Sequence, residues 1–413
     1  MREKIAALKH LNLRQAKSLM QVIGLCLIAL LFLNHAVPFA LRNIHSAEWD
    51  QSAYLKLALQ IKHGIALTDG SRNPLYPLLL TPMARQEIGF FTDAKVLSLV
   101  LGGIGLLMIY GVAYRIVGGL GALTVAGLMA INPQYHYFAG FVDAEILLIP
   151  LFFVAWYLNC QTIQTITQKD LADAHQMRRQ RRLAWMAGIA AGLVYLTKGT
   201  GFLLVIIFLA TVFLLKGPRF IRDGSVGCFL ASFALLSLPL WIYNWHHYGN
   251  PLYNINTTHI LWLDDWDLRY LYSDDNLPTM MSYLQTHSAR EIISRLIHGI
   301  VASPTQWTRA VWPALGASSP DQFIPASIAT LSITLLGVLL ALGIGRRAYA
   351  HRWRARRGWL IYTLLGMGSF WLLFSWYRPV ADDARFIFPW VPVLYVAPCW
   401  LLKESLSKFK SEK

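Results

Sequence analysis

Two carboxylates stand directly after the first long apolar stretch of the sequence, in the segment Glu48-Trp49-Asp50. A carboxylate at a membrane boundary can accept the proton of a hydroxyl group and so act as a general base. Both side chains could instead do no more than solvate the end of a helix, and their spacing does not decide between these interpretations. Among the acidic residues, this pair is the leading candidate for catalysis.

A second acidic pair, Asp143 and Glu145, opens the fourth apolar stretch. It follows an aromatic segment, residues 132–138, and lies on the same predicted side of the membrane as Asp50. Acidic groups near the N-terminus of a helix interact favourably with the helix dipole. Capping of this helix is therefore the alternative to a role in a site.

Three cations are placed where a negatively charged ligand could use them. Lys198 separates two short apolar stretches, where a charge is costly unless it faces a partner or a cavity, and a phosphate would be a natural partner. Its alternative is to extend towards the membrane interface. Arg385 follows Asp382 and Asp383, so an internal ion pair competes with an anion site. For Arg72, too, an internal ion pair competes with an anion site.

A further acidic group, mixed with aromatic residues, lies in the long polar segment after the seventh apolar stretch. Aromatic rings there could stack on a sugar, or they could anchor the chain at the membrane interface. The members of this group are Trp262, Asp264, Asp265, Trp266 and Asp267.

The elements that must position these side chains are membrane helices. The chain has 413 residues, of which 55% are hydrophobic and 14% are charged. A bilayer core about 30 Å thick is crossed by roughly 20 apolar residues, and the sequence contains such stretches repeatedly. We therefore expect an all-α polytopic bundle of about ten transmembrane spans. Their predicted ranges are 19–41, 94–114, 119–133, 143–163, 183–197, 200–215, 225–245, 325–345, 358–377 and 385–402.

The distribution of charge predicts how this bundle is oriented. The net charge of +15 could indicate a nucleic-acid partner, but the basic residues gather in short segments between the spans. Lys and Arg in such loops are retained on the cytoplasmic side. We therefore expect no nucleic-acid partner, both termini in the cytoplasm, and a multi-pass protein of the cell inner (cytoplasmic) membrane among its lipids. The four cysteines fall inside apolar stretches without metal-type spacing, so no disulfide framework or zinc site is expected.

Two segments are too long to be turns, residues 42–93 and 246–324, and both fall on the predicted outer side. The first contains an alternation of apolar and polar residues over 51–62 that suits an amphipathic helix lying in the membrane interface. We expect residues 1–402 to form a single transmembrane domain and residues 403–413 to form a short basic cytoplasmic tail.

The order of these motifs along the chain resembles the GT-C superfamily of polytopic membrane glycosyltransferases. The likeness is to its family 39 and dolichyl-phosphate-mannose mannosyltransferase-like group, which includes the aminoarabinose lipid A transferases, and it covers nearly all spans. The motifs that carry it are Trp49-Asp50-Gln51-Ser52-Ala53-Tyr54, Arg72-Asn73-Pro74-Leu75-Tyr76-Pro77, Asp143-Ala144-Glu145, Leu196-Thr197-Lys198-Gly199, Tyr243-Asn244-Trp245 with Gly249-Asn250-Pro251, and Ala384-Arg385-Phe386.

This resemblance implies a glycosyltransferase that moves a hexosyl or pentosyl group from a polyprenyl-phosphate sugar to a hydroxyl of a lipid, glycan or protein acceptor. Transfer would take place at the outer face of the membrane, with inversion at the sugar carbon. By the same resemblance Asp50 would be the general base. The donor phosphate would be bound by Lys198 and Arg385, with Arg72 as a further cation.

The resemblance also assigns a pocket and shows one departure. Tyr54 and Tyr76 would shape the pocket, to which the acidic pair at the start of the fourth span would contribute. Many relatives carry an Asp-Glu pair where this chain has Asp50-Gln51, so the second acid is missing unless Glu48 replaces it. The sequence itself requires no cofactor, and the family mechanism leaves room for a divalent metal ion.

Two other functions are compatible with the same residues. A lipid or polysaccharide transporter (a flippase) would also place cations and aromatic residues near lipid phosphates, although transporters often carry internal repeats and none is visible here. A non-catalytic membrane subunit would explain the loss of the second acid at Gln51. The transferase hypothesis requires Asp50, Lys198 and Arg385 to meet in one cavity.

Overall fold

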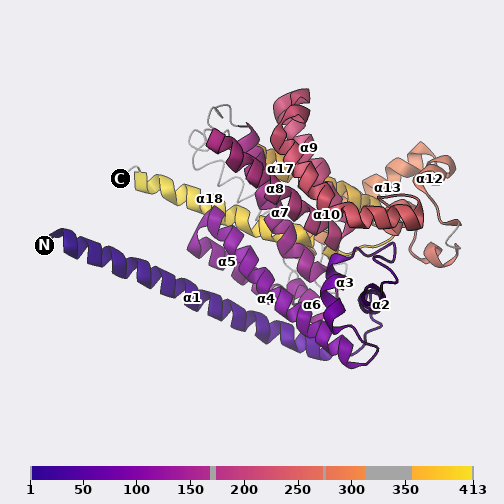
Figure 1. Ribbon diagram of the computed structural model, residues 1–413, viewed down its shortest axis with the longest axis horizontal. Helices are drawn as coiled ribbons and strands as arrows, with labels where there is room; N and C mark the ends of the chain where they lie inside the picture. The colour runs from indigo at the N-terminus through magenta and orange to yellow at the C-terminus, as the bar shows by residue number, and fades with distance from the viewer. Residues whose placement is uncertain (1, 168–173, 273–275, 312–355, 412–413) are drawn as a thin grey trace.

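The computed structural model describes residues 2–167, 174–272, 276–311 and 356–411, and within these ranges the chain forms helices and loops without a strand (Figure 1). Six of the described helical segments are long and apolar enough to cross a membrane. The predicted all-α polytopic bundle is therefore confirmed. The span expected at 325–345 lies outside the described residues.

The long helices follow most of the predicted spans. α8 is longer than predicted, because it begins in the basic segment before residue 183 and reaches about 36 Å over its 24 residues. The helices of the bundle are α1 (Arg2–Arg42), α4 (Gly89–Val117), α5 (Gly119–Ile131), α7 (Glu145–Thr167), α8 (Ala174–Thr197), α9 (Phe202–Lys216), α10 (Gly224–Tyr248), α17 (Arg357–Tyr377) and α18 (Val391–Ser411).

Shorter helices gather at one end of this bundle. Figure 1 shows α2, α3, α12 and α13 at the right end, whereas both ends of the chain lie at the left. The short elements are α2 (Gln51–Lys62), α3 (Leu75–Leu80), α6 (Pro133–Gly140), α11 (Ile255–Thr258), α12 (Met280–Thr286), α13 (Ala289–Ala302) and α14 (Pro304–Val311), with 3₁₀ turns η1 (Thr81–Met83), η2 (Gly199–Gly201), η3 (Gly217–Arg222), η4 (Ile260–Trp262), η5 (Asp267–Tyr270), η9 (Ala384–Phe386) and η10 (Phe388–Trp390).

The amphipathic helix predicted over 51–62 is present as α2. Its apolar face is buried through Tyr54, Leu57 and Ala58, whose spacing places them on one side of a helix. α2 packs on α3 and contacts α4, and the hydroxyl of Tyr76 on α3 lies 2.7 Å from that of Ser98 on α4. The first long loop is thus a folded cap on the bundle.

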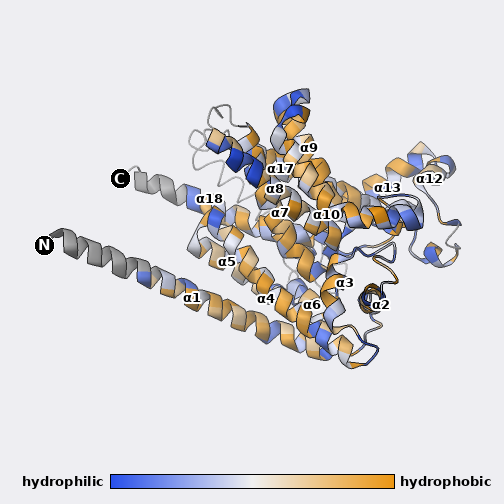
Figure 2. Ribbon diagram, viewed as in Figure 1, coloured by the Kyte–Doolittle hydropathy of each residue, from blue (hydrophilic) through white to orange (hydrophobic). Residues whose placement is uncertain are grey.

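Helix α1 lies along the outside of the bundle. It buries Ile28, Phe32, Ala36 and Ala40, four residues apart, so that only one face packs against α5 and α6. Most residues of its span are hydrophobic (Figure 2), and the exposed ones include Leu27, Leu30 and Leu33. Such a surface is stable where it contacts lipid.

Small residues allow the closest packing between helices. A Cβ atom placed on Gly188 of α8 would overlap the hydroxyl of Ser232 and the carbonyl of Phe229 on α10. Lipid-embedded helices associate mainly through such close contacts, because burial of apolar surface gives little advantage within a lipid environment. Gly188 therefore sets the separation of α8, which carries Lys198 at its end, from α10.

We predict that Gly188→Ala destabilises the protein by about 1–3 kcal/mol, the usual cost of an overpacked contact. Gly227→Ala on α10 is the matched control, because a Cβ there meets nothing within 4 Å and alanine favours a helix by up to about 1 kcal/mol. Thermal unfolding of the purified variants in detergent compares the two. Equal midpoints for both variants would contradict the proposed role of Gly188.

Candidate active site

The turn between α1 and α2 is held by the buried amide of Gln51. Its Nε2 donates to the Asn43 Oδ1 and the His45 carbonyl, each at 3.2 Å, and its Oε1 accepts from Asn43 at 2.7 Å and from the Val142 N–H at 3.0 Å. A glutamate at this position would lack the donor group. Gln51, where the resemblance implies a second acid, therefore has a structural role, because it fastens the turn that carries Asp50.

Asp50 stands at the start of α2 without capping that helix through its side chain. Its carboxylate forms ion pairs with Arg72 and, at 3.5 Å, with the Nη1 of Arg385. The side chain keeps 37% of its surface exposed. Asp50 thus presents its carboxylate to a pair of guanidinium groups and to open space.

Arg72 is oriented by the turn before α3. Asp69 accepts hydrogen bonds from the backbone N–H of Arg72 at 2.7 Å and from its Nη1 at 2.7 Å. The guanidinium lies over the Tyr54 ring at 5.5 Å. Burial lowers the pKa of Arg72, but Asp50 and Asp69 offset this effect and raise the pKa above its ordinary value. The side chain is therefore a permanent cation.

Lys198 follows the end of α8 and forms an ion pair with Glu145, the first residue of α7. Glu145 is buried, and its Oε2 has no hydrogen-bond partner in the described part of the chain. Neighbouring Asp143 is also buried, and burial followed by the charge of Glu145 raises the pKa of its carboxyl. Lys198 therefore compensates the buried charge of Glu145, while its ammonium lies 5.4 Å from the Phe386 ring.

Arg385 reaches the same place from the other end of the chain. It lies in η9, where Asp383 accepts its backbone N–H at 2.9 Å and pairs with its Nε at 3.5 Å. The guanidinium extends over Phe386 at 5.0 Å towards Asp50. Arg385 and Asp50 are 335 positions apart in the sequence, so the fold alone brings them together.

These side chains line one cavity of about 660 Å³ at the end of the bundle that carries α2 and α3. Of the residues predicted from the sequence, it contains Asp50, Tyr54, Arg72, Glu145, Lys198 and Arg385. The convergence of Asp50, Lys198 and Arg385 is therefore present in the structure.

Three predicted site residues do not line the cavity. Tyr76 is buried behind it, with its ring 5.2 Å from that of Tyr54 and its hydroxyl 2.7 Å from that of Ser98. Asp143 lies buried behind Glu145. Glu48 is exposed and lies outside the lining, so it does not take the place of the missing second acid in the cavity.

Other lining residues come from the second long loop, which sequence reasoning did not connect with Asp50. Asn254 donates to the Ser71 carbonyl at 2.9 Å, Asn256 donates to the Ser71 hydroxyl at 2.9 Å, and the N–H of Ile255 donates to the Gly70 carbonyl at 2.7 Å. These bonds fasten the second loop onto the turn that carries Arg72. Uncharged Asn residues in a polar loop give no periodic signal, so only the structure reveals them.

The cavity is a poor match for a divalent metal ion. Within the described ranges, no group of three His, Cys, Asp or Glu side chains is arranged to hold one. Both carboxylate oxygens of Asp50, one of Glu145, and the carboxylates of Asp382 and Asp383 already face cations of the chain. Hard divalent cations need several free oxygen ligands, and this donor set does not supply them.

Comparison with solved structures identifies the fold. The chain is similar to the oligosaccharyltransferase AglB from Archaeoglobus fulgidus in complex with an inhibitory peptide and a dolichol-phosphate, with a TM-score of 0.56 and 17% identity over 96% of this chain and 52% of that one. A structure of the same oligosaccharyltransferase tethered to an acceptor peptide has a TM-score of 0.54 and 17% identity, over 93% of this chain and 49% of that one. ArnT from Cupriavidus metallidurans bound to undecaprenyl phosphate has a TM-score of 0.41 and 12% identity, over 92% of this chain and 77% of that one.

At 17% identity the likeness to AglB is one of fold alone, and at this level it confirms the polytopic helical fold that the order of the motifs implied. The chain spans about half the length of the archaeal oligosaccharyltransferase. No protein-family model matches the sequence. No curated protein matches it either.

We predict that Lys198→Met destabilises the protein by on the order of 3 kcal/mol, because it leaves the buried carboxylate of Glu145 without a partner. Lys198→Met combined with Glu145→Gln should recover most of this loss, since neither charge then remains. Arg85→Met is the control, because the Arg85–Asp93 pair is 41% exposed on both sides and should contribute less than about 1 kcal/mol. Unfolding in mixed micelles measures all three, and a double variant no more stable than Lys198→Met would contradict the pairing.

Proposed function

We propose that this chain is a glycosyltransferase that moves a sugar from a polyprenyl-phosphate donor to a hydroxyl group of an acceptor, with Asp50 as the general base. The observation that carries the proposal is the meeting of Asp50 with Arg72, Lys198 and Arg385 in a single cavity. A carboxylate beside several cations supplies the two kinds of group that the reaction needs, a proton acceptor and a phosphate site.

The cations account for binding and departure of the donor phosphate. A guanidinium matches two phosphate oxygens with two parallel hydrogen bonds, whereas an ammonium acts as a point charge. In the structure, Arg72 and Arg385 form ion pairs with Asp50 instead. A donor phosphate of the same geometry would compete with Asp50 for both arginines, and its arrival would release the carboxylate for proton transfer.

The chemical step then balances without a covalent enzyme intermediate. The acceptor oxygen forms a bond to the anomeric carbon while the bond from that carbon to the phosphate oxygen breaks. The hydroxyl proton passes to Asp50, and the polyprenyl phosphate leaves with its negative charge stabilised by Arg72, Arg385 and Lys198. Attack opposite the leaving phosphate inverts the configuration of the sugar carbon.

The fold supports the donor class. AglB, which shares this fold, was solved with a dolichol-phosphate. The six long apolar helices described here would place the protein in the bilayer, where the polyprenyl chain of the donor also resides. We place the cavity at the outer face of the cytoplasmic membrane, with both termini inside, on the basis of the distribution of basic residues. The sugar would be a hexosyl or pentosyl group, and the acceptor a lipid, glycan or protein.

We predict that Asp50→Asn lowers the rate of sugar transfer by about 10²–10⁴-fold, the usual contribution of a general base. The same change should leave binding of undecaprenyl phosphate intact or tighten it several-fold, because Asp50 no longer competes for the two arginines. Transfer of a radiolabelled sugar in proteoliposomes and titration of the lipid phosphate measure the two effects.

Glu48→Gln is the matched control for this experiment, because Glu48 carries the same charge on the same turn and lies outside the cavity. Its transfer rate should stay within about threefold of the parent chain. Full transfer by a correctly inserted Asp50→Asn variant would refute the base role. Movement of lipid-linked sugar across the bilayer without transfer would favour a transporter.

We further propose that transfer needs no divalent metal ion, because the carboxylates of the cavity are already paired with Arg72, Arg385, Lys198 and Arg378. The predicted outcome is an unchanged transfer rate after dialysis against EDTA. A loss that Mg²⁺ or Mn²⁺ restores would contradict this prediction and assign the carboxylates to a metal.

A further inference from the structure

A second cavity, of about 810 Å³, lies beside the reaction cavity and between α12, α13 and the end of α17. Its lining combines charged, aromatic and apolar side chains. Those that matter for its chemistry are Asp264, His287, Glu291, Arg295, Val301 and Arg378. None of them takes part in the donor chemistry described above.

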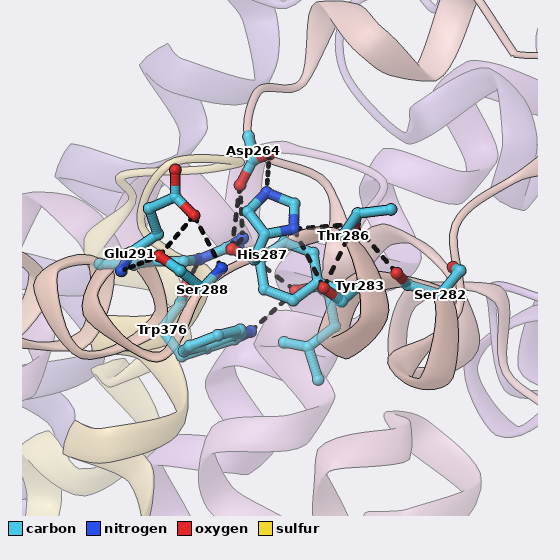
Figure 3. A network of polar contacts seen from close by, with 10 residues as sticks. Asp264, Ser282, Tyr283, Thr286, His287, Ser288, Glu291 and Trp376 are labelled. Carbon is cyan, nitrogen blue, oxygen red and sulfur yellow. Dashed lines mark hydrogen bonds and ion pairs between the residues drawn. The ribbon is translucent and has the colours of Figure 1, made fainter.

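Several residues of the lining belong to one network of polar contacts (Figure 3). Asp264 accepts hydrogen bonds from the Tyr283 hydroxyl and Arg295, both at 3.1 Å, and lies 3.0 Å from the Nε2 of His287. The His287 ring stacks on Tyr283 with centroids 3.8 Å apart. Arg295 has only 6% of its side chain exposed and donates to the Trp376 carbonyl at 3.1 Å. This network ties the second loop to α17.

The charges of the lining favour an uncharged polar ligand. The acidic Asp264 and Glu291 are balanced by Arg295 and Arg378. Arg378 donates through Nη2 to Asp382 at 3.0 Å, whereas its buried Nη1 has no hydrogen-bond partner among the described residues. Carboxylates that accept and a guanidinium that donates are the groups that bind neutral hydroxyls.

An apolar surface begins where this polar cavity ends. Ile293, Ile297 and Val301 are 57%, 52% and 73% exposed, and their four-residue spacing aligns them along one side of α13. Val301 belongs both to this apolar stripe and to the cavity lining. A ligand that enters here therefore meets polar groups at one end and an apolar helix face at the other, as an amphiphile requires.

One short segment separates the two cavities. Arg378 and Pro379 line the second cavity, whereas Val380, Ala381 and Asp382 line the reaction cavity. The ion pair of Arg378 with Asp382 spans this wall. The two cavities therefore adjoin each other along the segment from Arg378 to Asp382.

We propose that the cavity between α12 and α13 binds the acceptor, and that the acceptor is a lipid with an uncharged, hydroxyl-rich glycosyl headgroup. The headgroup occupies the polar cavity and the hydrocarbon chain lies along the stripe of Ile293, Ile297 and Val301. This inference rests on the proposed transferase function, to which it adds the chemical class of the second substrate.

A photocrosslinking experiment tests the proposal without a donor. The full chain is reconstituted in phosphatidylcholine nanodiscs that contain digalactosyl diacylglycerol with a diazirine in its acyl chain, and the crosslinks are mapped by mass spectrometry. We expect crosslinks on α13 to exceed those on the exposed face of α1 at least fivefold. Phosphatidylglycerol with the same diazirine should not show this enrichment.

Substitutions then locate the headgroup. Glu291→Gln, which preserves the capping hydrogen bonds to Ser288, and Arg378→Lys, which preserves a cation beside Asp382, should each lower the enrichment at least fivefold. Arg290→Gln is the control, because Arg290 is exposed on α13 and lies outside both cavities. Uniform labelling of all lipid-facing helices, stronger enrichment of the anionic probe, or no effect of both cavity variants would overturn the proposal.

The same experiment separates this inference from the proposed function. Enriched labelling in a chain that transfers no sugar from any polyprenyl-phosphate donor would leave a glycolipid site and refute the transferase. Loss of transfer in Asp50→Asn without enriched labelling would leave the transferase and refute this acceptor site.

Discussion

The arrangement of the site depends on the neutralisation of charge at one end of an apolar bundle. Asp50 lies between Arg72 and Arg385, and Glu145 lies against Lys198. Removal of Lys198 would leave the buried Glu145 unpaired, which costs several kcal/mol, whereas the partly exposed pairs of Asp50 contribute less. The start of α2, the turn before α3, the end of α8 and the 3₁₀ turn before α18 must therefore meet, and the first loop of the chain is fastened to its last helix.

The two ion-paired carboxylates, Glu145 and Asp50, differ in how strongly they depend on their cations for stability. Glu145 is almost fully enclosed, so Lys198 is needed to compensate it in every state of the protein. Asp50 keeps more than a third of its side-chain surface exposed, and its arginines also pair with Asp69 and Asp383. These arginines can exchange a carboxylate for a phosphate without leaving a charge buried and unpaired. The resting ion pairs thus hold the cations in the positions that donor binding would use.

Two cavities share the segment from Arg378 to Asp383, and the second long loop contributes to both. Hydrogen bonds from Asn254 and Asn256 attach this loop to the first one, while Arg295 attaches it to α17. A two-substrate reaction needs its acceptor and donor to be held at a fixed distance. One short wall between two pre-formed cavities is a direct way to achieve that spacing.

The sequence by itself determined the helical class, most of the spans and the amphipathic helix α2, because hydropathy and periodicity act over neighbouring residues. It also singled out Lys198, since a charge between apolar segments is costly and needs a partner, Asp50 as a carboxylate at the membrane boundary, and Arg385 as a cation beside two acidic residues. It could not identify those partners, which lie up to 335 positions away. From the sequence, Gln51 was interpreted as the loss of a second acid. Only the packing showed that its buried amide must both donate and accept hydrogen bonds. The cavity beside α13 was likewise decided by tertiary structure alone, because its lining joins Asp264 to Arg378 across helices that no local pattern relates.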